Sequence, residues 1–129
     1  MVKAINIKEE LKKLQFLEGR TMTSSDAELN AAFATLSGYD NGGVFTGSYS
    51  GESPWERHIM GDELVYILDG QTKLIILTDQ GEEVLDLSGG MLTVVPKGLW
   101  HRFKAPMGVT VLSVTPQPTE HSVADDPRS

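Results

Sequence analysis

The chain has 129 residues, 40% of them hydrophobic, which fits one compact domain with its own core, since domains commonly run to about 100–150 residues. Its 18 acidic residues outnumber its 11 basic ones, and the net charge of -7 disfavours nucleic acid and anionic membranes as partners. The absence of cysteine excludes disulfides, thiolate metal sites and cysteine nucleophiles, so a metal site here must use histidine and carboxylate ligands.

The first predicted element is an amphipathic helix in "NIKEELKKLQFLEG". Ile7, Leu11 and Leu14 share one helical face, Asn6 can cap the start and Gly19 can end it. We therefore expect residues 1–20 to form an N-terminal helical segment. The start is charged rather than apolar, and no window approaches the ~18 apolar residues of a membrane span, so a cytoplasmic protein is expected.

The stretch "SSDAELNAAFATLSGY" is ambiguous between helix and strand. Ser25 and Glu28 have the spacing of a helix-capping box, and the apolar residues that follow are helically spaced. The next stretch, "YDNGG", is typical of a hairpin turn that leads into "VFTGSYSG". We favour a strand from about residue 32.

From there the pattern indicates strands throughout. Short apolar or alternating runs such as "ELVYILDG", "QTKLIILTD" and "VTVLSVTP" are divided by Gly, Pro and Asp at close spacing. This predicts an antiparallel sandwich or barrel. We expect a single domain over residues 1–129, with the β-barrel at about 32–116 and a loose polar tail at 117–129.

Ionisable residues gather in "GESPWERHIMGDELVYILDG". In an extended segment, residues two apart share a face, so Glu56 and His58 point together and Arg57 points the opposite way. Glu63 opens the next strand, and a barrel can bring His101 to the same place from far along the chain. Two imidazoles and two carboxylates form a mixed nitrogen and oxygen set that suits a divalent metal.

Two spaced motifs carry a family resemblance. His58, Glu63 and Gly70 match the second half of the pattern G-x5-H-x-H-x3,4-E-x6-G. The second pattern, G-x5-P-x-G-x2-H-x3-N, is followed through its histidine by Gly90, Pro96, Gly98 and His101. With both motifs the chain resembles the cupins, over about residues 43–116.

The resemblance implies an all-β fold, the double-stranded β-helix or jelly-roll barrel, here with an N-terminal α-helix. It also implies that His58, Glu63 and His101 are metal ligands, with Fe, Mn, Zn or Ni as the divalent ion. Cupins are frequently dimers, and exposed edge strands give a physical route to pairing, so a homodimer is expected.

The departures from the family pattern fall at three positions. Glu56 replaces the first motif histidine, Gly51 is one residue closer than the pattern asks, and Ala105 replaces the closing asparagine. A carboxylate can still bind a divalent ion, so we expect Glu56 as a fourth ligand. The competing interpretation is that Glu56 forms a surface ion pair with an arginine.

Three functions are compatible with these residues. The first is a metal-dependent enzyme, such as an oxygenase or isomerase, that acts on a small polar metabolite with Glu63 as general base, or Glu56 if it does not bind the metal. The second is a non-catalytic module that senses or sequesters a metal or small ligand. The third is a degenerate barrel that serves only for structure or dimerisation. Of the other residues, Phe103 is expected in the pocket, whereas Arg57, Trp100 and Arg102 are expected to face outward and His121 to face solvent.

Overall fold

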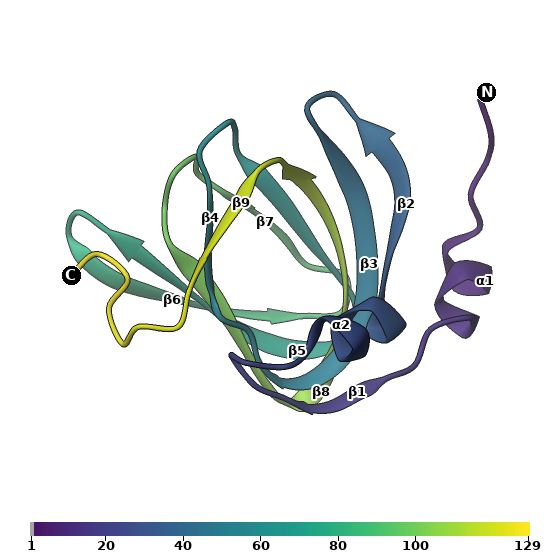
Figure 1. Cartoon of the computed structure of the whole chain (residues 1–129), viewed down its shortest axis with the longest axis horizontal. Helices are drawn as coiled ribbons and strands as arrows, with labels where there is room; N and C mark the ends of the chain where they lie inside the picture. The colour runs from purple at the N-terminus through teal and green to yellow at the C-terminus, as the bar shows by residue number, and fades with distance from the viewer. Residues whose placement is uncertain (1) are drawn as a thin grey trace.

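Nine strands and two short helices make up residues 2–129, the part of the chain that the computed structural model describes. In chain order they are α1 (Ile7–Lys12), β1 (Leu17–Arg20), α2 (Asp26–Ala32), β2 (Phe33–Tyr39), β3 (Gly42–Glu52), β4 (Trp55–His58), β5 (Glu63–Thr78), β6 (Gly81–Ser88), β7 (Leu92–Val95), β8 (His101–Pro116) and β9 (Thr119–Ser122). Figure 1 shows the strands curving around a common centre, with β4 and β9 on one side and β2 and β3 on the other. The all-β barrel predicted from the sequence is confirmed.

The two 16-residue strands β5 and β8 hold the barrel together. β8 runs antiparallel to β3 along one edge and to β5 along the other. β5 also pairs with β7 through its first residues and with β6 through its last. Because each strand is long and bends, one strand can serve both ends of the barrel.

The main core lies inside this curve and follows the alternation of the strands. Val65 and Ile67 in the first part of β5 have no exposed surface, and neither has Leu74 in the second part. Burial of such side chains contributes about 1.5–3 kcal/mol each to folding. The other buried members of the cluster are Tyr49, Ile76, Leu87, Val95, Ala105, Val109 and Val111.

A second apolar cluster lies on the opposite face of β4 and β5. It comprises Trp55, Ile75 and Leu77, with Met22 and Trp100 packed against it. The Arg57 guanidinium lies 4.6 Å from the centre of the Trp100 ring, and Arg102 lies 4.8 Å from that of Trp55. Arg57, Trp100 and Arg102 therefore lie on the outer face, as their strand parity predicts.

The N-terminal segment differs from the sequence prediction. The helix ends at Lys12 instead of near Gly19, and residues 17–20 form a strand parallel to β3. Asn6 does cap the helix, since its side chain accepts the amide N–H of Glu9. Pairing with β3 outweighs the helical spacing because it gives the backbone a partner strand, which is tertiary context that a local pattern does not contain. Among the described residues, neither helix is long and apolar enough to cross a membrane.

The ambiguous stretch contains both a helix and a strand. Ser25 and Glu28 form the reciprocal capping box of α2. The strand β2 then begins at Phe33 and returns through the Asp40–Asn41 turn to β3, with Tyr39 opposite Gly42. The hairpin and the strand near residue 32 are confirmed, and the capping pattern belongs to a helix that precedes them.

The tail expected to be loose contributes a strand. β9 pairs antiparallel with β4, from Trp55 opposite Ser122 to His58 opposite Thr119. The edge of β4 has backbone groups to satisfy, and a polar segment satisfies them as well as an apolar one. The hydropathy pattern therefore gave no sign of β9. This strand closes the side of the barrel that carries His58.

Candidate metal centre

Two histidines far apart in sequence are brought together because the turn before β8 is hydrogen-bonded to the end of β4. His58 ends β4 and His101 begins β8, where it is paired with Glu56 in the strand register. Between β7 and β8, the Pro-x-Gly turn reaches back: the Gly98 amide donates a 2.9 Å hydrogen bond to the His58 carbonyl. Gly98 has φ +81°, a left-handed conformation that glycine adopts without strain. A backbone hydrogen bond thus joins the two sequence motifs.

The third member of the group is Glu63, the first residue of β5. Its Oε1 lies 3.0 Å from Nε2 of His101, and its Oε2 lies 3.4 Å from Nε2 of His58. All three residues are buried, and one donor atom from each lies within 4.8 Å of the others. The structure therefore brings together His58, Glu63 and His101, as the resemblance of the two motifs implies.

Hydrogen bonds from the far side of each ring fix how the imidazoles are presented. Nδ1 of His101 lies 3.0 Å from the Leu99 carbonyl and must donate to it. Nδ1 of His58 lies 3.0 Å from Oγ1 of Thr119, whose own hydroxyl donates to Gln117 Oε1 at 3.2 Å. Thr119 therefore accepts from His58. Both Nε2 atoms are left to face Glu63, as ligand imidazoles held by outer partners do.

The electrostatics of the group favour a charged carboxylate. Burial alone would raise the pKa of Glu63, but the imidazoles of His101 and His58 outweigh it and lower the pKa to about 2. Burial would likewise lower the pKa of His101, yet the bond to Glu63, the nearby charge of Glu56 and the Leu99 carbonyl raise it. The Thr115 hydroxyl donates to Glu63 Oε2 at 2.6 Å, which also stabilises the anion.

The residues fit a divalent cation. Nε2 of His58 is buried and makes no hydrogen bond among the described residues, and it lies 3.4 Å from Glu63 Oε2, so a metal ion can replace a proton between these two atoms. Two imidazole nitrogens and one carboxylate form a ligand set common for catalytic zinc and also suited to other divalent ions.

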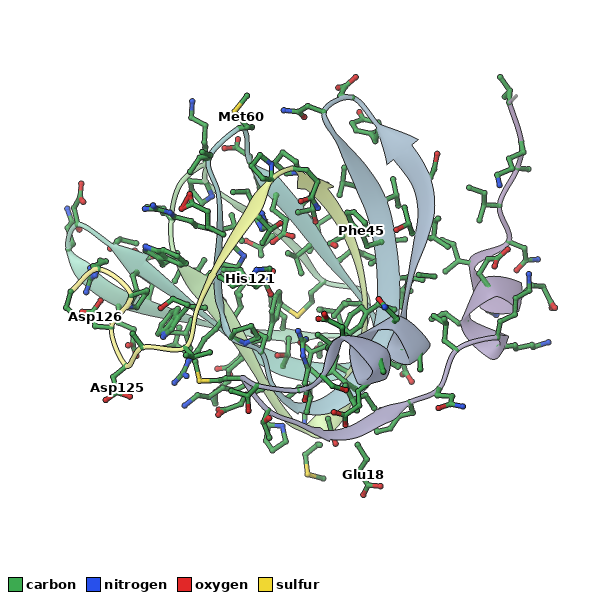
Figure 2. The ribbon with its side chains drawn as sticks, viewed as in Figure 1. Glu18, Phe45, Met60, His121, Asp125 and Asp126 are labelled. Carbon is green, nitrogen blue, oxygen red and sulfur yellow. The ribbon has the colours of Figure 1, made fainter. Side chains whose placement is uncertain are left out.

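A cavity of about 400 Å³ opens beside this group, with Glu63 in its wall. Its lining combines aromatic and aliphatic side chains with hydroxyl, amide and charged groups, among them Phe103, as predicted. Figure 2 labels two residues that line it, Phe45 on β3 and His121 on β9. A pocket of this size admits a small molecule.

Glu56 lines the cavity but is not one of the three clustered residues. Its carboxylate lies 3.9 Å from Nε2 of His121, and its side chain is 20% exposed. The arginine pairing considered for it does not occur, because Arg57 binds Glu120 instead, at 2.8 Å. Strand parity correctly placed Glu56 beside His58 on the inner face.

Three polar contributors were not anticipated from the sequence. Thr115 holds Glu63, Thr119 holds His58, and His121 stands at the rim, although 57% of its side chain is exposed. The solvent assignment of His121 is thus incomplete, since β9 turns it toward Glu56. The sequence offered one signal for polar groups at this site: Ser113, Thr115 and Gln117 alternate along the chain, which places their polar side chains on one face of the strand.

Comparison with known families agrees with this geometry. The family model described as the cupin domain matches residues 45–115. The chain belongs to the cupin family. Comparison with curated protein sequences gave no significant match.

Solved structures with this cupin fold come from several kinds of protein. A cupin-2 domain containing protein from Shewanella frigidimarina superposes with a TM-score of 0.62 at 17% identity, covering 92% of this chain and 94% of that one. Hydroquinone 1,2-dioxygenase in complex with Cd²⁺ and 4-hydroxybenzonitrile gives 0.56 at 20% identity, with 65% and 63% covered. Oxalate decarboxylase from Bacillus subtilis, whose structure concerns Mn(II) centres, gives 0.58 at 11% identity, with 69% and 26% covered.

Proposed function

We propose that this cupin binds one divalent metal ion through His58, Glu63 and His101 and acts on a small polar molecule in the adjoining cavity. The observation that carries the proposal is the buried, unpartnered Nε2 of His58, which faces a carboxylate whose pKa is lowered to about 2. Two proteins with a similar fold are described with Cd²⁺ and with Mn(II), which supports a divalent metal ion as the group bound here.

Each residue of the group has a separate task. The two Nε2 atoms and the Glu63 carboxylate would hold the ion, while Thr119 and Leu99 fix the imidazoles through Nδ1. A bound divalent ion would supply Lewis-acid or redox chemistry to an oxygen-bearing substrate. If Glu63 serves as a ligand, it is no longer free to act as the general base proposed from the sequence.

The remaining carboxylate of the cavity is Glu56. It is half-buried, borders the cavity that also contacts Glu63, and has an imidazole within 3.9 Å. We assign it the proton transfer, with His121 as the group that exchanges protons with solvent. Its alternative role as fourth ligand needs a movement toward the other three residues.

Metal titration of matched variants tests the proposal. Apo protein, prepared without a chelating tag, is titrated with Zn²⁺ and Mn²⁺ in competition with a chromophoric chelator. Wild-type protein should take up one equivalent, and Glu63→Gln should bind at least about tenfold more weakly because an anionic ligand is lost. Glu120→Gln, which removes the same charge on the outer face, should stay within about twofold. No stoichiometric uptake, or equal effects of the two substitutions, would refute the metal centre.

Glu56→Gln separates the two roles of that residue. As a proton-transfer group it leaves metal affinity within about twofold, whereas as a ligand its loss weakens binding about tenfold or more. The catalytic and non-catalytic functions differ in a further observable: a sensor or sequestering cupin binds metal and ligand without forming product.

A further inference from the structure

The wall of the cavity contains one arginine that has no counter-ion. Arg20, the last residue of β1, lines the cavity together with Glu63. Its Nε is buried without a hydrogen-bond partner, and it forms no ion pair with any carboxylate that the structure describes. Arg20 as a whole is only partly exposed, so its guanidinium has lost part of its hydration without gaining a counter-ion, and a bound anion would compensate for that loss.

Aromatic rings hold this guanidinium in place from the protein side. Its Cζ lies 4.7 Å from the centre of the Tyr49 ring and 5.2 Å from that of Phe33. Stacking of this kind orients a planar guanidinium and leaves its N–H groups to bind at their edge. Tyr49 and Phe33 line the same cavity, so the stack forms part of its wall.

The glycine that departs from the family spacing explains how β1 reaches this position. Arg20 lies opposite Gly51 in the parallel pairing of β1 with β3. A Cβ at residue 51 would overlap the Arg20 carbonyl oxygen and lie 2.6 Å from its amide nitrogen. Gly51, with φ +107°, thus allows the backbone approach that positions Arg20.

The rest of the lining limits what the anion can be attached to. Three phenylalanines border the cavity, Phe33, Phe45 and Phe103, and Leu29, Val65 and Val111 add further apolar surface. The two acidic residues of the lining, Glu56 and Glu63, would repel a carboxylate from their end of the metal-free cavity and direct it toward Arg20.

We infer that Arg20 is the specificity-determining residue of the cavity, and that the ligand is a carboxylate carried on a flat apolar body. The carboxylate forms two parallel bonds with the guanidinium, while the body lies among the phenylalanines. This inference rests on the proposed function in taking the cavity as the substrate site, and it adds the class of substrate.

Calorimetric titration with benzoate and its uncharged isostere benzamide tests the inference. Both probes are titrated into wild-type, Arg20→Met and Arg102→Met proteins, each metal-free and zinc-loaded. Arg102 is the matched control, because it also stacks on an aromatic ring and has a buried Nε without a partner, but does not line the cavity. Arg20→Met should weaken benzoate binding about 10- to 100-fold in both metal states, the loss of a charge-assisted bond pair. Arg102→Met should stay within about twofold.

Benzamide should bind wild-type protein at least about tenfold more weakly than benzoate and should be insensitive to Arg20→Met. Arg20→Lys keeps the charge without the planar fork and should retain an intermediate benzoate affinity, which shows that a loss in Arg20→Met is not unfolding. The inference is overturned if benzoate does not bind, if benzoate and benzamide bind equally, or if Arg20→Met and Arg102→Met behave alike. Zinc affinity, measured separately, should stay within about twofold in Arg20→Met, so failure of the metal centre and failure of carboxylate recognition give different results.

Discussion

Replacing Thr119 by valine removes the hydroxyl that orients His58 and leaves the side-chain shape nearly unchanged. Nδ1 of His58 donates to this oxygen at 3.0 Å, and β9 supplies it only because residues 119–122 pair with β4. Loss of one such bond costs about 0.5–1.5 kcal/mol, or roughly 2- to 12-fold in an equilibrium constant. Loss of the preferred tautomer adds to this, and outer partners of metal-bound histidines account for about 10- to 100-fold in affinity. We expect Zn²⁺ affinity to fall by about tenfold or more.

Competition with a chromophoric chelator at fixed pH measures this change directly. Thr110→Val is the matched control, because Thr110 lies on β8 and its hydroxyl bonds with the Ser48 hydroxyl on β3, 2.8 Å away, and not with a residue of the metal centre. Thr119→Ser keeps the hydroxyl and should remain within about threefold of wild type. If Thr119→Val stays within twofold of wild type, or if Thr110→Val loses as much, then His58 is not presented to the metal by Thr119.

Three further predictions follow from burial and charge. His101→Ala should reduce the zinc content of purified protein far more than His121→Ala, as measured by elemental analysis; equal losses would remove His101 as a ligand. The melting temperature of metal-free protein should be highest between about pH 4.5 and 6.5. The lowered pKa of Glu63 stabilises the folded state, and this stability is lost as the pH falls from 4.5 toward about 2. The raised pKa of His101 also stabilises the folded state, and that stability is lost as the pH rises above 6.5. A melting temperature that does not fall on either side of this range would contradict the pairing of Glu63 with His101. Leu74→Ala should destabilise the protein by about 2–5 kcal/mol in urea unfolding, whereas Leu92→Ala, 58% exposed, should cost little; similar costs would contradict the assigned core.

The three clustered residues were predictable because two spaced motifs resemble those of the cupins, and short-range rules explain the positions of the residues within each motif. Alternation along β4 places His58 on the inner face, and a Pro-x-Gly turn of fixed length sets where His101 begins β8. Glu63 follows because it starts the next strand after a short turn. The barrel itself was predictable from the regular succession of apolar runs and turn residues.

The parts that were missed depend on contacts between distant backbones. Arg20 lies on a strand that the local spacing assigned to a helix, and only its pairing with β3 at Gly51 brings it to the cavity. Thr119 and His121 lie in a polar tail whose strand pairing leaves no trace in hydropathy. Hydroxyl groups such as that of Thr115 are common on strands. Their hydrogen bonds to site residues can be identified only when the pairing register of β5 and β8 is known.

Anomalous diffraction from crystals of the zinc-loaded protein tests the central claim most directly. Data collected on the two sides of the zinc absorption edge should show one strong peak per chain, about 2.0–2.2 Å from Nε2 of His58, Nε2 of His101 and a carboxylate oxygen of Glu63. A zinc-loaded crystal with no peak among these three residues, or with its peak elsewhere in the chain, would contradict the metal centre.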